Sequence, residues 1–273
     1  MIRSIKQQAK ALVKGLPGKY SLFILPIILS IVNITISYRE TTIDSIDAQV
    51  SLSATIFPPL VTFLIAFFTI SALYTMLEVV RQERKAVEFG DLMQSFSGGR
   101  FAKLFVTLLV RNLLILPWAF LFGIGMGLML GVMIVSLEHS ESLGSVDVII
   151  TLLGLVLMVA GMILIIWKSN QYSQTEFVIY DQIAQNRYQG PLAAIKESKQ
   201  LMKGHIFELF KLYLSFIGWY LLTFLTFGLV SIYLIPYMTT TRAVYYQYLL
   251  EQNGAPTTEY QDGPIQESPF DVR

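Results

Sequence analysis

The sequence has no cysteine and only two histidines among its 273 residues. The absence of cysteine excludes disulfide bonds, thiolate metal sites and thiol catalysis. With His139 and His205 as the only imidazoles, a histidine-built metal site is not expected either. The sequence also lacks a glycine-rich phosphate loop and a nucleophile elbow, and its loops are too short to hold a catalytic domain. We therefore expect no catalytic residue, no metal and no cofactor, and a protein that is not an enzyme.

Charged residues are scarce as well, at 14% of the chain, whereas apolar residues make up 54% and the mean hydropathy is +0.57. A soluble domain carries about a quarter charged residues. The lipid bilayer, rather than a buried core, must therefore be the solvent for most of the chain. No signal peptide is expected, because no apolar core and cleavage site follow the first charges. A nucleic-acid partner is not expected.

Six apolar stretches are long enough to cross a hydrocarbon core of about 30 Å at about 1.5 Å per residue. Three hairpins follow from their short connections, and the last hairpin turns at residues 226–228. The predicted fold is all-α, a polytopic bundle in one membrane domain (1–250) followed by a disordered cytoplasmic tail (251–273). Pro117 and Pro236 lie inside spans, where proline removes a main-chain hydrogen bond and kinks the helix. The spans cover residues 20–37, 56–80, 112–137, 146–167, 206–226 and 228–249.

Three amphipathic segments precede the hairpins. Residues 2–16 are apolar on one face and basic on the other, which is typical of a helix that lies on a membrane. A plain basic leader is the alternative reading. A second such helix is predicted by apolar residues at helical spacing from Phe89 to Phe96, and a third by residues 191–203, which begin with proline. Together they predict cytoplasmic surface helices.

The basic residues predict the orientation of the chain. Of its 20 lysines and arginines, all except Arg39 fall on one side of the predicted bilayer. Lysine and arginine accumulate on the cytoplasmic side of membrane proteins. We therefore expect a multi-pass protein of the cell membrane with both termini in the cytoplasm.

Similar junctions link each amphipathic segment to its hairpin: GKYSLF (18–23), GRFAKLF (99–105) and GHIFELF (204–210). They indicate a unit of surface helix, glycine and hairpin that is used three times. The alternative is that any chain re-entering a membrane favours glycine and aromatic residues at that point.

The last third of the chain carries recognisable elements. They are Ser-Lys-x-Leu-Met-x-Gly at residues 198–204, Phe-Ile-Gly-Trp at 216–219, and Pro236-Tyr237. With these elements the chain resembles the bacterial integral membrane family catalogued as domain of unknown function 975. The resemblance implies a Gram-positive plasma membrane protein and assigns no activity, substrate or catalytic residue. The glycine-rich third span is longer than the family pattern leads one to expect.

Gly123, Gly127 and Gly131 fall on one face of the third span. Small residues at this spacing let another helix approach closely. The neighbour is expected to be the fourth span, with Gly154 and Gly161, while a second copy of the chain and a substrate groove are alternatives. Gly125 lies off this face, so Gly127→Leu should damage the protein more than Gly125→Leu.

Ionisable residues near membrane depth are functional candidates. Counting along the second hairpin brings Arg111 and Glu176 to a similar depth, so we expect an ion pair between them. The same count in the last hairpin brings Glu208 near Arg242. The alternatives are a proton relay for the latter pair, and separate side chains that reach the headgroups.

The leading hypothesis is a non-enzymatic membrane protein that organises or partners other membrane components through its basic cytoplasmic face. Its expected partners are the bilayer itself, anionic lipids, and a membrane protein or second copy of the chain. The alternative is a transporter or export factor for an amphipathic or lipidic small molecule, which broken helices and internal repeats would suit.

Overall fold

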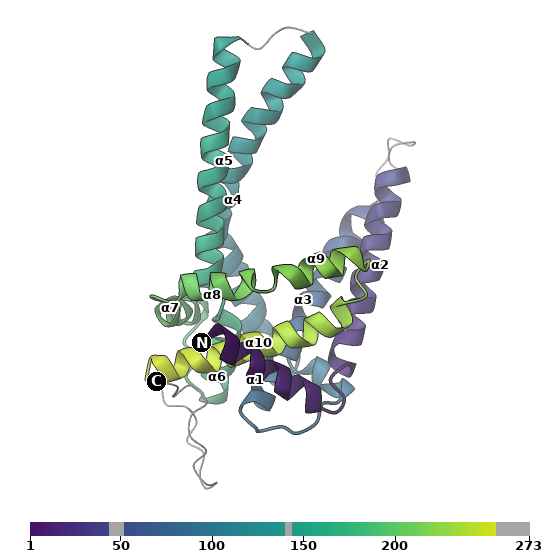
Figure 1. Ribbon diagram of the computed structural model, residues 1–273, viewed down its shortest axis with the longest axis vertical. Helices are drawn as coiled ribbons and strands as arrows, with labels where there is room; N and C mark the ends of the chain where they lie inside the picture. The colour runs from purple at the N-terminus through teal and green to yellow at the C-terminus, as the bar shows by residue number, and fades with distance from the viewer. Residues whose placement is uncertain (44–51, 140–143, 255–273) are drawn as a thin grey trace. The chain divides into compact units, whose positions relative to one another are not determined.

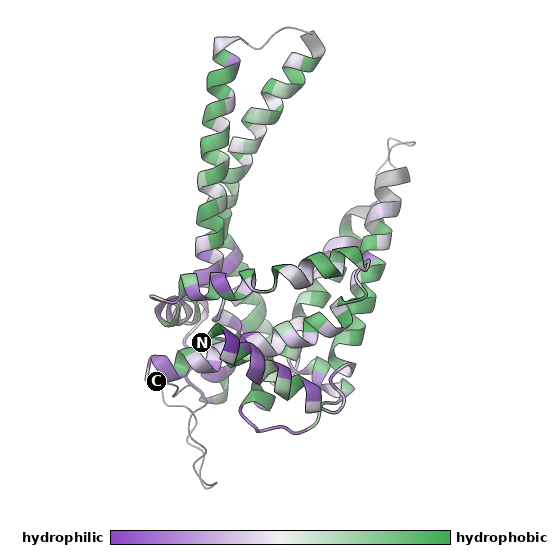
Figure 2. Cartoon of the chain, in the orientation of Figure 1, coloured by the Kyte–Doolittle hydropathy of each residue, from purple (hydrophilic) through white to green (hydrophobic). Residues whose placement is uncertain are grey.

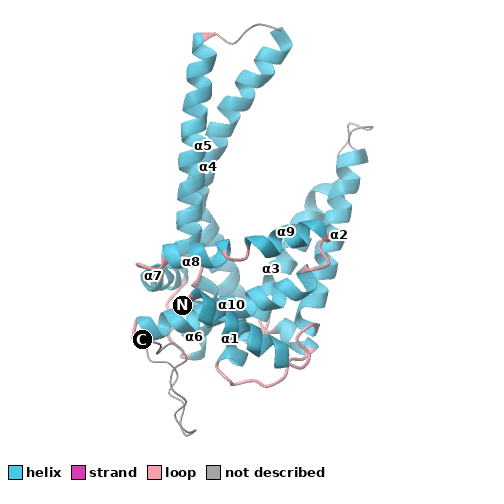
Figure 3. Cartoon of the chain, in the orientation of Figure 1, coloured by secondary structure: helices cyan, strands magenta, loops and turns pink. Residues whose placement is uncertain are grey.

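The computed structural model describes residues 1–43, 52–139 and 144–254, and within these ranges the chain is helical with short turns and no strand (Figure 3). The all-α prediction is therefore confirmed for the described residues. Predictions for the tail beyond residue 254 and for the loop around residue 47 lie outside them. The helices are α1 (Ile2–Gly15), α2 (Ser21–Ile43), α3 (Leu52–Val80), the short 3-10 helix η1 (Phe89–Met93), α4 (Arg100–His139), α5 (Ser145–Gln171), α6 (Thr175–Ala184), α7 (Pro191–Leu201), α8 (Ile206–Leu214), α9 (Ile217–Leu225) and α10 (Ser231–Gln252) (Figure 1).

Two compact units make up the chain, which passes from one to the other near the start of α4 and again within α8. The first unit combines Met1–Ala102 with the chain from Phe210 onward, and the second is Lys103–Leu209. In the first unit, α10 packs against α1, α2 and α3, while η1 packs against α2 and α3. Because most residues in the second half of α10 are buried, this helix forms the core of its unit.

The second unit is built on the hairpin of α4 and α5, whose helices run alongside each other (Figure 1). Both helices are apolar around nearly their whole circumference (Figure 2). In the most apolar stretch of each, only 11% of the residues are buried. Helices this apolar and this exposed need lipid around them rather than water. After a turn at residues 172–174 the chain continues into α6, against which α7 packs.

Four helical stretches are long and apolar enough to cross a membrane, which makes this a membrane-embedded protein. They are Ile56–Val80, Arg100–Leu137, Ser145–Ala184 and Ile206–Leu225. The predicted first span corresponds to a shorter apolar helix, Ser21–Ile36. The predicted sixth span, 228–249, falls on α10, which is not among the four because its threonines, tyrosines and Arg242 lower its hydropathy.

The apolar face of α1 packs on protein rather than on lipid. Ile5, Ala9, Val13 and Leu16 are at most 7% exposed, and α1 contacts α10 along its length. This corrects the expectation of a helix lying on the membrane. Docking on α10 removes the same apolar area from water and adds close packing, and each fully buried aliphatic side chain contributes about 1.5–3 kcal/mol.

The second predicted surface helix is also different. In place of an amphipathic helix over 89–96, the chain forms a five-residue 3-10 helix in which Phe89 and Met93 are 56% and 48% exposed. Gly90 lowers the helix propensity here, and two glycines follow at 98–99. Of the four apolar residues, Leu92 is buried, and the centroid of the Phe96 ring lies 5.4 Å from that of Phe67. The third predicted helix, 191–203, forms as α7, which ends at Leu201 and has proline in its first turn. Its place on the cytoplasmic side stays a prediction.

Pro117 and Pro236 lie inside α4 and α10, and each helix continues on both sides of its proline. In α10 the hydroxyls of Thr240 and Thr241 donate to the carbonyls of Pro236 and Tyr237, at 2.9 and 2.7 Å. These bonds keep the threonine hydroxyls satisfied inside the buried helix.

Candidate functional site: polar networks and a glycine contact

A buried pair of serines joins α3 to the segment after η1. The Ser71 hydroxyl donates to the Ser95 hydroxyl at 2.8 Å and accepts from the Ser95 amide at 3.0 Å. The Ser95 hydroxyl in turn donates to the Phe67 carbonyl at 3.0 Å. Both serines are completely buried, so leaving either hydroxyl unbonded would cost about 1–3 kcal/mol.

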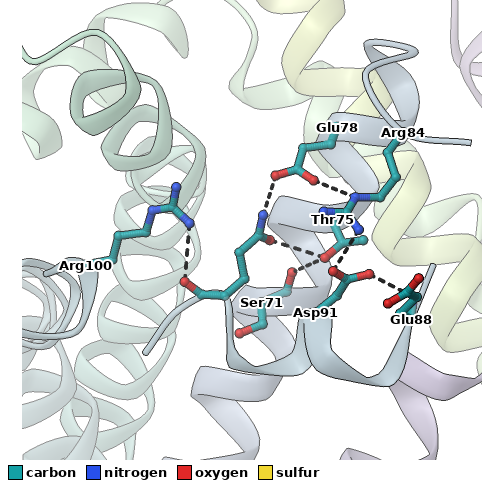
Figure 4. A network of polar contacts seen from close by, with 8 residues as sticks. Ser71, Thr75, Glu78, Arg84, Glu88, Asp91 and Arg100 are labelled. Carbon is teal, nitrogen blue, oxygen red and sulfur yellow. Dashed lines mark hydrogen bonds and ion pairs between the residues drawn. The ribbon is translucent and has the colours of Figure 1, made fainter. Parts of the chain in front are cut away.

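Charged groups continue this network outward, as Figure 4 shows. Arg84 lies between two carboxylates, with 2.8 Å from its Nε to Glu78 and 2.7 Å from its Nη1 to Asp91. Burial of Arg84 lowers its pKa, but hydrogen bonds and charge from Glu78 and Asp91 outweigh this and raise it. The side-chain amide of Gln94 donates to Glu78 and its oxygen accepts from Thr75 at 3.2 Å. We call this set the α3 network.

A second set, the α6 network, joins α6 to α7. The Ser198 hydroxyl donates to the Gln171 carbonyl at 3.1 Å and accepts from the Gln174 amide at 3.2 Å. Glu197 accepts two hydrogen bonds from Arg187, at 2.8 and 3.0 Å, and a third from the Gln182 side chain at 2.7 Å. The fork geometry of the arginine fixes the loop between the two helices.

The two networks follow one pattern. Each has a completely buried serine that donates to a main-chain carbonyl in the preceding helix region, 28 residues back from Ser95 and 27 back from Ser198. In each, the residue before the serine bonds to a residue of the preceding helix, and this pair consists of one carboxylate and one amide. An arginine binds the carboxylate in both networks, and in the α3 network it also binds a second carboxylate, Asp91. The carboxylate and the amide exchange places between the two networks. In the α3 network the helix residue is Glu78 and the residue before the serine is Gln94, whereas in the α6 network the helix residue is Gln182 and the residue before the serine is Glu197. This correspondence supports the internal repeat.

The expected ion pair between Arg111 and Glu176 is present, with 2.5 Å from Arg111 Nη1 to Glu176 Oε1. It joins α4 to α6. The side chains are 23% and 9% exposed, so the carboxylate is well removed from solvent. Every residue from Thr175 to Gln182 in α6 is buried. This stretch is the most enclosed polar part of the second unit and is the leading candidate site.

The other polar pair is placed differently. Glu208 lies 2.7 Å from the Nδ1 atom of His205, one helical turn earlier. Arg242 lies in α10, in the other unit. A pair between Glu208 and Arg242 therefore stays a prediction.

The close contact between α4 and α5 runs through Gly125, not through the face predicted from the sequence. A Cβ atom added at Gly125 would lie 2.4 Å from the Met158 amide nitrogen. Gly154 and Gly161 meet α4 as expected, with added Cβ atoms 2.8 Å from the Gly125 carbonyl and 2.5 Å from the Phe122 amide. Added Cβ atoms at Gly123, Gly127 and Gly131 have no neighbour within 4 Å. The spacing rule identifies a small-residue face, but it does not say which face the partner helix takes.

Sequence analysis also missed Lys6, which fastens α1 to the turn between α8 and α9. Its ammonium group donates to the Ser215 carbonyl at 3.0 Å and lies 4.3 Å from the centroid of the Phe216 ring. A cation is favourable there because Ser215 follows the carboxyl end of α8. Burial lowers the pKa of Lys6. A lysine on an amphipathic helix resembles its solvated neighbours, so no sequence signal marked it.

These networks hold helices in place, and their chemistry is that of hydrogen bonds and ion pairs. In the described part of the chain, no group of three or more His, Asp or Glu residues could hold a metal ion. Ser95 and Ser198 were also missed, although a serine on the apolar face of a helix is a usable signal for such a bond.

A family model described as "Protein of unknown function (DUF975)" matches residues 1–253. The chain belongs to this family. The expected resemblance is thereby confirmed and extends over nearly the whole chain. No functionally curated protein and no solved structure is similar enough to match it. For this DUF975 protein, function must therefore be argued from its own residues.

For the glycine contact, we predict that Gly125→Ala lowers the melting temperature in detergent, because its methyl group would overlap the main chain of α5. Alanine at Gly127 should be neutral or stabilising, since alanine is better than glycine in a helix by about 0.5–1 kcal/mol. Both variants add one methyl group to a glycine of α4, at positions two residues apart, so each serves as the control for the other. A lower melting temperature for Gly127→Ala than for Gly125→Ala would contradict the contact.

For the ion pair, we predict that Arg111→Glu and Glu176→Arg each destabilise the purified protein by about 2 kcal/mol. This value lies between those of exposed pairs and of buried pairs that lose one partner. The double exchange restores opposite charges and should recover much of the loss. Thermal unfolding of all four proteins gives the coupling between the two sites. Simple additivity would show that the two side chains act independently.

Proposed function

We propose that this protein is a non-enzymatic component of a bacterial plasma membrane that gathers anionic phospholipids at its cytoplasmic face. In this proposal both units belong to one multi-pass membrane domain with both termini in the cytoplasm. The gathered lipids form the surface that recruits or orders other membrane proteins. The orientation rests on the uneven distribution of lysine and arginine.

The observation that carries the proposal is the way α1 and α7 use their two faces. In α7 the apolar residues Ala194, Ile195 and Leu201 are buried, whereas Leu192 at its start is exposed. In α1, which packs on α10, Ile5, Ala9 and Val13 are buried. The exposed cations are Arg3, Lys10 and Lys14 in α1, Lys196 and Lys199 in α7, and Lys203 in the turn that follows α7. Since the apolar faces are already occupied by protein, these helices are not membrane anchors. Their remaining surface fits negatively charged headgroups, each cation contributing about 1 kcal/mol near an anionic leaflet.

We predict that the purified protein in mixed-lipid nanodiscs enriches phosphatidylglycerol over phosphatidylcholine. Replacing these six exposed cations by glutamine should remove most of this enrichment, and 0.5 M salt should weaken it in the unaltered protein by screening. Lipid composition is measured by mass spectrometry of lipids that stay bound after detergent extraction.

The matched control is Gln7→Ala with Gln200→Ala, which alters exposed residues on the same two helices without removing charge. It should leave the enrichment unchanged. Equal enrichment in the unaltered and six-glutamine proteins would show that the basic faces do not select lipid.

The second candidate function is transport of an amphipathic or lipidic molecule. The observation that favours it is the interruption between α8 and α9, inside a stretch long enough to cross a membrane. Transporters place such breaks at their binding sites. Here the break is instead held by Lys6, which supports a fixed rather than a moving element. Movement of labelled lipid between the leaflets of proteoliposomes would favour the transporter.

A further inference from the structure

The most exposed side chains of the turn between α9 and α10 are apolar. Phe224, Leu225, Phe227 and Leu229 are 81%, 71%, 99% and 72% exposed. No charged residue occurs between Lys211 and Arg242. By contrast, the connections of the other two predicted hairpins carry charge: residues 38–55 contain four charged residues, and residues 138–145 contain Glu138 and Glu141. A loop in water gains nothing from such a surface, whereas one in hydrocarbon requires it.

The main chain of this turn needs no water. The amide hydrogens of residues 226–232 all find acceptors within the turn and its flanking helix ends. The tightest is that of Gly228, which donates to the Thr223 carbonyl at 2.8 Å. The Thr226 hydroxyl donates to the Leu222 carbonyl at 2.8 Å and accepts from the Val230 amide at 3.4 Å. Positive φ angles of 50° at Phe227 and 88° at Gly228 close the turn. The other acceptors are the carbonyls of Leu222 for residue 226, Phe224 for 227, Thr226 for 229, Gly228 for 231 and Leu229 for 232.

Lys6 shows how far the hairpin reaches from the membrane surface. The ammonium group of Lys6 donates to the Ser215 carbonyl, and the main-chain carbonyl of Lys6 accepts a hydrogen bond from the Tyr237 hydroxyl at 3.3 Å. Since Lys6 lies on a helix with exposed cations, Ser215 and Tyr237 lie near the headgroup level. From Phe216 to Phe227 an α-helix rises only about 17 Å at about 1.5 Å per residue. This is roughly half of a hydrocarbon core of about 30 Å.

The remainder of α10 lies on the polar side of this level. Arg81, just past the end of α3, donates from its Nε to the Gln247 side chain at 3.2 Å. The cationic helix α1 packs against the same helix. Within the first half of α10, only the stretch from Ser231 to about Tyr237 is therefore left to enter hydrocarbon, and this stretch is too short to cross it.

We propose that α9 and the first half of α10 form a re-entrant hairpin. It enters the bilayer from the side on which α1 lies, turns near the midplane among the lipid acyl chains, and returns to the same side. It replaces the two complete spans that the sequence predicts at 206–226 and 228–249. Because both ends stay on one side, the distribution of basic residues is the same in either arrangement. The hairpin does not depend on the selection of anionic lipid.

The cysteine-free chain allows a direct test with single cysteines. Leu229→Cys probes the turn, Ser142→Cys the predicted outer loop, and Lys199→Cys an exposed position on α7. In intact cells, a membrane-impermeant maleimide should label Ser142→Cys and leave the other two unlabelled. After lysis Lys199→Cys should become labelled, whereas Leu229→Cys should react only once detergent has denatured the protein. Labelling of Leu229→Cys in intact cells at the rate of Ser142→Cys would overturn the proposal.

The depth of the turn is measured separately. A fluorophore on the Leu229 cysteine, in vesicles of phosphatidylcholine, is quenched by nitroxides placed on the headgroup, at carbon 5 or at carbon 12 of the acyl chain. We expect the strongest quenching from carbon 12. Strongest quenching from the headgroup nitroxide would place the turn at a surface and reject the hairpin. This outcome would not alter the lipid-enrichment result, so the two proposals fail independently.

Discussion

The structure depends on one constraint: a polar group that cannot reach water must find its partner within the chain. Where lipid or protein encloses the main chain, an unsatisfied group costs several kcal/mol. The buried hydroxyl of Ser95 meets it through the Phe67 carbonyl, and that of Ser198 through the Gln171 carbonyl. Arg111 and Glu176 meet it through each other. The turn after α9 meets it through its own carbonyls and one threonine hydroxyl.

The same constraint applies to the three short elements α1, η1 and α7, each of which packs on another helix. α1 packs on α10, η1 on α3 and α7 on α6, so each lies against another helix of its own unit. In two of the three settings a buried serine and a set of carboxylate, amide and arginine fix the joint. In α1 the corresponding buried small residue is Ala9. It precedes Gly15 by six residues, just as Ser198 in α7 precedes Gly204 by six. The polar joint there is replaced by Lys6 on the turn after α8.

The sequence predicted the helical class, the membrane setting and the Arg111–Glu176 pair, because these follow from hydropathy and from counting along helices. It predicted the wrong glycine face, since spacing identifies small residues without showing where the neighbouring helix lies. It put α1 on lipid, because amphipathicity states that a face is buried but not by what. The joints at Ser95, Ser198 and Lys6 depend on contacts between residues more than 20 positions apart, which a single sequence does not show.

If the apolar face of α1 is held by α10, the exposed cations Arg3, Lys10 and Lys14 can bind partners on the membrane surface. Amide hydrogen exchange of the full-length protein tests this most directly, compared between detergent without lipid and nanodiscs containing phosphatidylglycerol. Amides around Ile5, Ala9 and Val13 should exchange slowly, and to a similar degree, in both environments, because the protein itself covers them. Rapid exchange of α1 in detergent, with protection only in nanodiscs, would show that lipid rather than α10 holds the helix and would contradict the account.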